Sequence, residues 1–225
     1  MLLELKHISV GYERPLVKSI HAKVSAGDLV VLVGKNGSGK STLLNAIKGV
    51  LKVQSGVATL NNKPITAHSA KELSRNIAVV NTSRPVLNSW TVLDLLKSTV
   101  GPKDKSDQII QKASALCKIE HLAQKYIDTL SDGEFQKVMI ARAICQQTPL
   151  IILDEPTSFL DVIYREHVLQ IFRELKDTFG TTLVLSSHNF APLLKIASQV
   201  WVISHGSMEV MESDFDYAKI IQSLK

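Results

Sequence analysis

The loop at residues 34–42, with the sequence GKNGSGKST, constrains the fold of this chain more than any other segment. It follows a short apolar run rich in β-branched residues at 29–33, and helical sequence follows it over about 40–50. The spacing fits G-x-x-x-x-G-K-[ST], in which glycines let successive backbone N–H groups point at phosphate oxygens and the helix N-terminus adds its positive end. The sequence therefore predicts a phosphate-binding loop between a buried parallel strand and a helix.

The side chains of this loop have separate expected roles. Lys40 is expected to bridge the β- and γ-phosphates of a nucleotide, and the Ser41 hydroxyl is expected to bind Mg²⁺. The alternative is a glycine-rich turn that binds nothing, but a chance match in a chain of this length is on the order of one in a hundred. The expected nucleotide contacts are Gly34, Lys35, Asn36, Gly37, Ser38, Gly39, Lys40, Ser41 and Thr42.

Two adjacent acids, Asp154 and Glu155, follow an apolar strand expected at 150–153. The carboxyl ends of parallel strands meet at the ligand-binding edge of a sheet, which places both acids near the phosphates. Asp154 then suits Mg²⁺ through a water molecule, and Glu155 suits orienting and deprotonating the water that attacks the γ-phosphate. The alternative is a pair of acids on a solvated rim, which the phosphate loop disfavours.

Hydrophobic periodicity divides the chain into an α/β core and a helical insertion. Residues 85–147 show helical periodicity with little strand signal, most clearly at 104–118 and 131–147. A later helix has an apolar stripe over 168–175, and a short one is expected at 217–224. The expected strands are 2–10, 18–24, 29–33, 57–60, 77–80, 150–153, 182–186, 199–204 and 207–211.

Composition and charge disfavour several classes of protein. The formal net charge is +5, but the positive residues are scattered, which favours a solvated basic surface over a nucleic-acid site. Aromatic residues make up only 5% of the chain, which disfavours stacking on single-stranded bases. Cys117 and Cys145 lack ligand-like spacing and are expected as reduced thiols. No apolar run approaches the roughly 20 residues that span a bilayer, and residues 1–6 lack the pattern of a signal peptide.

With these motifs in place, residues 2–211 resemble the ABC ATPase family. The segment LSDGE at 130–134 matches the family signature L-S-G-G-Q in three of five positions and lies 20 residues before the strand that carries the two acids. The resemblance implies that Ser131 and Gly133 contact the γ-phosphate of an ATP bound to a partner chain. Ser131 and Glu134 also form the pattern of a helix-capping box, and the two interpretations are compatible.

The resemblance implies the fold class α/β, a P-loop NTPase core with an N-terminal antiparallel β subdomain and an inserted α-helical subdomain. The whole chain, 1–225, is then a single ABC ATPase domain. Its core lobe comprises 1–82 and 148–225, and its helical lobe covers about 83–147.

Three further residues match family positions. Asp161, at the end of the segment PTSFLD, resembles the aspartate that reaches across the dimer, although it would also serve as an N-cap. His188 resembles the switch histidine that contacts the γ-phosphate, and it joins Glu155 and Lys40 as an expected catalytic residue. Tyr12 resembles the aromatic that stacks on adenine; its alternative is a turn residue packed on the first strands.

The chain departs from the family pattern at two places. Asn81 and Thr82 follow the strand at 77–80, and Thr82 occupies the position of a glutamine that contacts the metal. A water molecule would have to bridge this shorter side chain. Asp132 and Glu134 also add negative charge to the signature, which repels phosphate unless Mg²⁺ or lysines screen it.

The resemblance implies a homodimer that sandwiches two ATP molecules with Mg²⁺. Among family members, the chain is most similar to ATPases that power import of iron chelates, haem or cobalamin. It would sit at the cytoplasmic face of the cell membrane on a polytopic permease, with a periplasmic binding protein in the full system and no nucleic-acid partner. Trp90 and Leu87 are candidate permease contacts, and a core position is the alternative for Trp90. The alternative functions are a soluble ABC ATPase of nucleic acid, ribosomes or cluster assembly, and the ATPase of a lipoprotein or export system.

Overall fold

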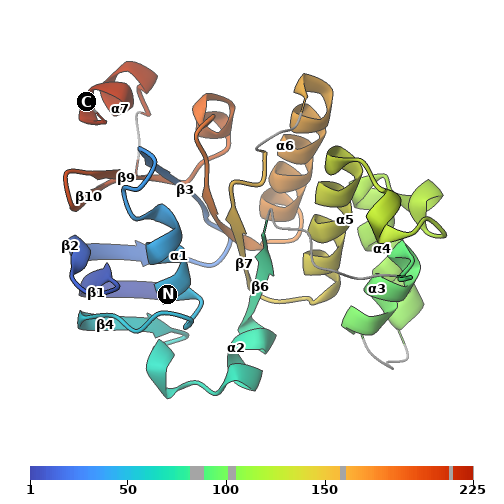
Figure 1. The fold of residues 1–225 in the computed structure, drawn as a ribbon, viewed down its shortest axis with the longest axis horizontal. Helices are drawn as coiled ribbons and strands as arrows, with labels where there is room; N and C mark the ends of the chain where they lie inside the picture. Colours follow the sequence, from blue (N-terminus) through green and yellow to red (C-terminus); the bar gives the residue numbers. More distant parts are fainter. Residues whose placement is uncertain (82–88, 101–104, 158–160, 213–214, 225) are drawn as a thin grey trace.

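The protein is described by a computed structural model that covers residues 1–81, 89–100, 105–157, 161–212 and 215–224. Two sheets, with one helix between them, pack beside a layer of further helices (Figure 1). The smaller sheet is antiparallel, with strand order β2-β1-β4-β5. Its strands are β1 (Leu3–Gly11), β2 (Pro15–Val24), β4 (Ser55–Leu60) and β5 (Lys63–Pro64).

The larger sheet has the order β10-β9-β3-β8-β7-β6. All of its pairs are parallel except β9 with β10, which are joined by a tight turn. Every residue of β3 is buried, as expected for a strand covered on both faces. The strands are β3 (Leu29–Gly34), β6 (Ile77–Val80), β7 (Leu150–Asp154), β8 (Thr182–Ser186), β9 (Gln199–Ser204) and β10 (Ser207–Met211).

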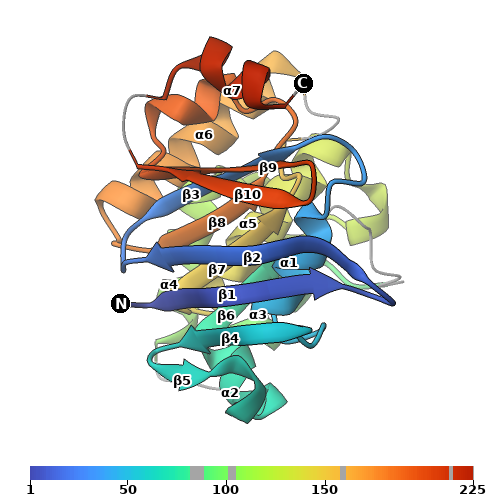
Figure 2. The ribbon, with the colours of Figure 1, turned by 90° about the vertical axis from the view of Figure 1, so that its left-hand side faces the viewer.

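The helices cover the larger sheet on its two faces. Helix α1 lies between the two sheets, while α5 and α6 cover the opposite face; Figure 2 shows the small sheet in front of the large one with α5 behind. Helices α3, α4 and α5 pack together as a separate group beside this core. The helices are α1 (Lys40–Ile47), α2 (Ala70–Asn76), α3 (Val92–Val100), α4 (Ser106–Cys117), α5 (Asp132–Cys145), α6 (Val162–Asp177) and α7 (Tyr217–Ser223), with 3-10 turns η1 (Ile65–Ala67), η2 (Glu120–Leu122), η3 (Ile127–Thr129) and η4 (Ala191–Lys195).

Side-chain alternation along β3 joins two hydrophobic cores. Val30 and Leu32 pack with α1 and the antiparallel sheet. Leu29, Val31 and Val33 point to the other face and pack with the helical group. Because successive side chains of a strand point to opposite faces, this one strand is buried from both sides, and its end is held rigidly where the phosphate loop begins.

The structure confirms the fold class, with differences at element ends. β2 begins at Pro15 instead of residue 18, because the hairpin is tighter than the turn-rich sequence suggests: Gly11 pairs with Pro15. A Cβ on Gly11 would lie 2.0 Å from the Arg14 carbonyl oxygen, so glycine is required there. α1 ends at Ile47, three residues before the expected end at Val50.

Helix α2 was not predicted, although its N-terminus carries a recognisable signal. Ser69 and Glu72 form a complete capping box, the same pattern that correctly predicts the start of α5. With seven residues and no buried side chain, α2 lacks the apolar stripe that marked the other helices. In the described part of the chain, no helix is long and apolar enough to cross a membrane.

Candidate functional site

The phosphate loop leaves the end of β3 and enters α1 through two glycines with left-handed backbone. Gly37 has φ 76° and Gly39, the N-cap of α1, has φ 107°. Residues with a Cβ are strained at such backbone angles. A Cβ on Gly34 would lie 2.4 Å from the Ser38 Oγ, so this position has no room for a side chain either. The loop therefore has the backbone that its sequence pattern predicts.

Lys40 lies buried across the mouth of this loop. Its Nζ donates hydrogen bonds to the carbonyl oxygens of Gly34 at 2.9 Å and Lys35 at 3.2 Å. Burial lowers the pKa of Lys40, whereas the negative charges of Glu155 and Asp154 raise it. The ammonium is thus near both acids, although more than 110 residues separate them in the sequence.

Asp154 and Glu155 are joined to the next strand through one hydroxyl group. Parallel pairing of β7 with β8 sets Asp154 opposite Ser186. The Ser186 Oγ donates to Asp154 Oδ1 at 2.6 Å and accepts from the Glu155 backbone N–H at 2.9 Å. Glu155 has φ 53°, which a residue other than glycine adopts only where its surroundings hold it. Ser186 is fully buried and holds this turn.

Ser186 was not among the residues expected at the site from the sequence. A signal was available, because a serine that ends one parallel strand lies level with the acid that ends its neighbour. Its use required the register, which only the assembled sheet provides. Lys48, just after α1, was missed for the same reason, because its proximity to Asp154 depends on the assembled fold. Burial lowers the pKa of Lys48, and the negative charge of Asp154 raises it.

Glu155 contacts His188 at two points. The His188 backbone N–H donates to Glu155 Oε2 at 3.1 Å, and His188 Nε2 lies 3.0 Å from Glu155 Oε1. The imidazole is about half exposed, while the carboxylate is mostly covered. If the exposed ring turns toward a ligand, the carboxylate keeps its hydrogen bond from the His188 backbone N–H.

The oxygen groups near the loop suit a magnesium ion. Ser41 is exposed at the start of α1, and Asp154 lies at the end of β7. Mg²⁺ prefers a few hard oxygen ligands together with water and phosphate oxygens. Among the described residues, no group of three or more His, Cys, Asp or Glu side chains could hold a metal alone. The chemistry of these residues therefore fits a metal that enters with a nucleotide.

The signature segment caps α5, as the sequence predicts. Ser131 is exposed at the N-cap, and its Oγ accepts from the Glu134 N–H while Glu134 Oε2 accepts from the Ser131 N–H. Lys125 Nζ also lies 3.0 Å from Glu134 Oε1. Hydrogen bonds from the Ser131 backbone and from Lys125 lower the pKa of Glu134 to about 2. Lys125 therefore balances the charge of Glu134, one of the two acids that distinguish this signature.

Gly133 and Asp161 are linked through Tyr164 on α6. A Cβ on Gly133 would lie 2.9 Å from the Tyr164 ring, and the same ring faces Lys137 Nζ at 5.1 Å. Asp161 caps α6 by accepting from the Tyr164 N–H at 2.9 Å, which confirms its expected N-cap position. Tyr164 therefore contacts the signature turn through its ring and the capping aspartate through its backbone N–H.

The remaining candidates lie on the surface or outside the described residues. Tyr12 is 67% exposed in the β1–β2 turn, so its ring is not packed on the first strands. Trp90 is 38% exposed beside the start of α3, on the surface and not in the core. Asn81 is exposed after β6, whereas Thr82 and Leu87 lie outside the described residues.

The structure therefore brings some of the expected site residues together and not others. Lys40, Asp154, Glu155 and His188 meet at the carboxyl edge of the large sheet. Ser131 and Asp161 instead cap two helices and expose their side chains there. Such a division is expected if a second molecule completes the site.

The chain is similar to ATP-binding proteins of ABC transporters. A family model described as ABC transporter matches residues 17–158. An uncharacterized ABC transporter ATP-binding protein of Methanocaldococcus jannaschii is 34% identical over 213 residues, which cover 91% of this chain and 73% of that protein. A hemin import ATP-binding protein of Thermobifida fusca is 32% identical over 215 residues, covering 92% and 75%.

A solved structure of a nucleotide-free ATP-binding cassette from an ABC transporter superimposes with a TM-score of 0.84 at 25% identity, covering 99% of this chain and 94% of that one. The family match spans more than half of the chain and includes the phosphate loop, the signature and both acids. The chain belongs to the ABC transporter family, as an ATP-binding subunit with ATPase activity.

Proposed function

We propose that the chain powers import of an iron chelate, haem or cobalamin through a separate membrane permease. The contact between Glu155 and His188, beside Lys40 and Asp154, is the observation that carries the hydrolytic part. The import part is supported by similarity to a hemin import ATP-binding protein and by the Leu-Ser-Asp-Gly form of the signature.

In the proposed reaction, Glu155 is the general base. The phosphate loop and Lys40 hold the triphosphate, and the His188 ring turns from Glu155 to the γ-phosphate when ATP binds. That movement leaves Glu155 Oε1 available to accept the proton of the attacking water. The His188 backbone N–H, at 3.1 Å from Oε2, keeps the carboxylate in place meanwhile.

Ser41 and Asp154 are the residues that would hold Mg²⁺. When bound, the ion neutralises charge on the β- and γ-phosphates. In this proposal the Ser41 hydroxyl would supply an oxygen ligand to the ion, and the Asp154 carboxylate would hold it through a water molecule. Ser186, through its 2.6 Å hydrogen bond, fixes the rotamer of Asp154 in that role.

A second copy of the chain completes each ATP site in this proposal. Ser131 and Gly133 of one copy would face the γ-phosphate held by the other, and Asp161 would reach across the interface. The surface next to Asp161 supports this, because Val162 and Ile163 are each 70% exposed at the start of α6. Adjacent exposed aliphatic side chains suit a surface that another molecule covers.

We place the chain at the cytoplasmic face of the cell membrane, as one ATPase domain with its core lobe in 1–82 and 148–225 and its helical lobe in about 83–147. The permease would dock on the helical lobe, where Trp90 and Tyr126 are 38% and 52% exposed. A periplasmic binding protein would deliver the substrate on the far side. No nucleic-acid partner is proposed.

Reconstitution tests this function. The chain is purified with the polytopic membrane protein that accompanies it and placed in vesicles that enclose ATP and Mg²⁺, with the substrate-binding protein of the same system added outside. Uptake of radiolabelled haem, a ferric siderophore or cobalamin is then measured. ATP-dependent uptake of one of them, lost in Glu155→Gln, is expected. Co-purification with ribosomes or DNA instead of a membrane protein would contradict the proposal.

A further inference from the structure

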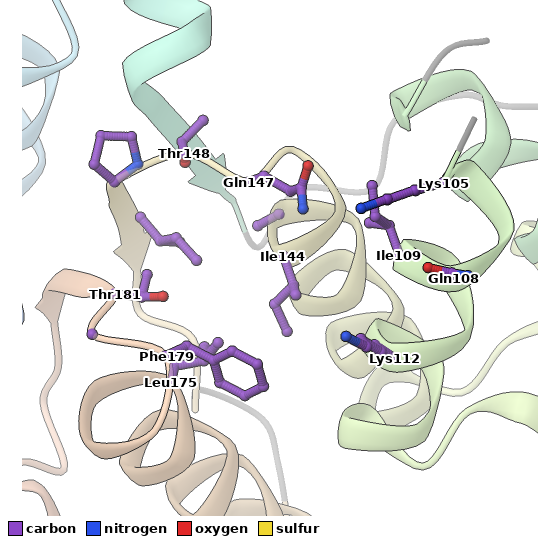
Figure 3. Close-up of a pocket in the computed structure, with 14 residues that line it drawn as sticks. Lys105, Gln108, Ile109, Lys112, Ile144, Gln147, Thr148, Leu175, Phe179 and Thr181 are labelled. Carbon is purple, nitrogen blue, oxygen red and sulfur yellow. The ribbon is translucent and has the colours of Figure 1, made fainter. Parts of the chain in front are cut away.

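A cavity of about 850 Å³ lies away from the phosphate loop, near the amino ends of strands β7 and β8. It is bounded by one face of α4, the C-terminal part of α5, the start of β7 and the connection from α6 to β8 (Figure 3). Its volume falls in the range of pockets that bind small molecules. None of the residues that line it belongs to the ATP site described above.

The α4 wall of this cavity is cationic and polar. Four residues at spacings i, i+3, i+4 and i+7 lie on one side of α4, beginning at its N-cap. They are Lys105, Gln108, Ile109 and Lys112. Figure 3 shows the nitrogen ends of both lysines directed from α4 toward α5. Within the described ranges, neither ammonium has a carboxylate within the 4.0 Å of an ion pair. Two exposed lysines, about two helical turns apart, therefore make this wall of the cavity cationic.

The facing wall is mainly apolar. Phe179 is 54% exposed at the end of α6, although large aromatic side chains are usually well covered. Ile144 and Leu175 lie beside it in the same cavity (Figure 3). An apolar surface that faces two ammonium groups across a cavity matches a molecule with an apolar body and one anionic end.

We propose that this cavity binds an amphipathic anion, a small molecule with a carboxylate, sulfonate or phosphate group and an apolar body. The anionic group lies against the α4 wall that carries Lys105 and Lys112, and the apolar body covers Phe179, Ile144 and Leu175. A neutral apolar molecule would gain nothing from the two ammonium groups, and an inorganic anion would leave the apolar wall exposed.

The position of the cavity gives this ligand a route to the ATPase site. Helix α5 lines the cavity near its end with Ile144 and begins at the Ser131 cap, while β7 lines it with Ile151 and ends at Asp154. A ligand held between α4 and the core favours one placement of the helical group against the sheet. By linkage, a ligand that favours the placement in which ATP binds must bind more tightly when ATP is present.

Binding is tested with anilinonaphthalene sulfonate, a fluorescent amphipathic anion, added to the full chain with ADP filling the nucleotide site. N-phenylnaphthylamine, the same aromatic body without the sulfonate, is the neutral control. The double variant Lys105→Gln/Lys112→Gln is compared with Lys71→Gln/Lys195→Gln, which removes two exposed lysines outside the cavity.

The expected result is one saturable site for the sulfonate whose dissociation constant rises about tenfold in the cavity variant and stays unchanged in the matched control. The neutral probe should bind both variants equally, and Phe179→Ser should weaken both probes. Decanoate should displace the sulfonate. Equal sulfonate binding by the cavity variant and wild type would overturn the site, and so would equal loss in the control.

Coupling between the cavity and the ATP site is tested by a separate measurement. The sulfonate should shift the ATP concentration that gives half-maximal hydrolysis in wild type and leave it unchanged in Lys105→Gln/Lys112→Gln. Saturated binding without any shift in wild type would overturn the coupling. Because binding is measured without turnover, its failure is distinguishable from failure of the ATPase mechanism.

Discussion

Replacement of Ser186 by alanine removes the hydroxyl group that joins Asp154 to Glu155. Two hydrogen bonds are lost: one to a carboxylate at 2.6 Å and one from the Glu155 backbone N–H at 2.9 Å. A hydrogen bond to a charged group contributes about 1.5–3 kcal/mol and a neutral one about 1 kcal/mol. Since Asp154 is partly exposed, water can replace some of this, which leaves a net loss of about 1–2 kcal/mol.

The lost hydrogen bonds position Asp154 and Glu155, and neither involves the phosphate loop. If the net loss appears wholly in the transition state, kcat falls about 5- to 30-fold, because each 1.36 kcal/mol is a factor of ten. The affinity for ATP should change little, since Lys40 and the loop make their own contacts. Steady-state hydrolysis, with ATP binding measured separately by fluorescence of a labelled nucleotide, distinguishes the two.

The neighbouring serine provides a matched control. Ser187 is equally buried, and its hydroxyl has no hydrogen-bond partner among the described residues. Ser187→Ala should therefore leave kcat near the wild-type value. Equal kcat in Ser186→Ala and wild type would refute the positioning role, and an equal fall in both alanine variants would show that packing, not the hydrogen bonds, matters.

Three further predictions concern the nucleotide contact and the signature helix. Tyr12→Ala should weaken ATP binding by about 1–2 kcal/mol while Tyr12→Phe keeps it, because stacking needs only the ring; equal affinity in all three, measured by calorimetry, would exclude stacking. Gly133→Ala should lower the free energy of unfolding by about 1–3 kcal/mol in urea, since its Cβ would lie 2.9 Å from the Tyr164 ring; Gly133→Ala combined with Tyr164→Ala should recover part of that loss, and purely additive losses would contradict the clash. The pKa of Glu134 is lowered from 4.5 to about 2, so its ionised carboxylate stabilises the fold above pH 4.5, and this stabilisation is lost as the pH falls toward 2. Glu134→Gln should flatten the dependence of the free energy of unfolding on pH in this range, and an unchanged slope between pH 5 and 2 would contradict the assignment.

Local sequence patterns were sufficient for the parts of the site that local geometry determines. The phosphate loop was predictable because its glycines meet a backbone requirement, at Gly37 and Gly39, that no other residue meets without strain. The Ser131–Glu134 capping box was predictable because its hydrogen bonds join residues three apart. Asp161 as the cap of α6 follows the same logic.

Contacts between distant segments were not predictable in this way. Ser186 reaches Asp154 only through the register of β7 and β8, and Tyr164 covers Gly133 only because α6 packs beside α5. Lys125, which balances Glu134, lies nine residues away in a turn whose path the sequence does not indicate. Pairing of this kind depends on tertiary structure, which local propensity does not specify.

The shared ATP site with Glu155 as its base is tested by the Glu155→Gln variant, measured for ATP turnover and for mass in solution with and without ATP and Mg²⁺. Glutamine keeps the size of the side chain but cannot act as the base at neutral pH. Hydrolysis should fall at least about a hundredfold, and an ATP-bound dimer should accumulate in place of the monomer. Hydrolysis at the wild-type rate, or a variant that stays monomeric with saturating ATP, would contradict a shared site with Glu155 as its base.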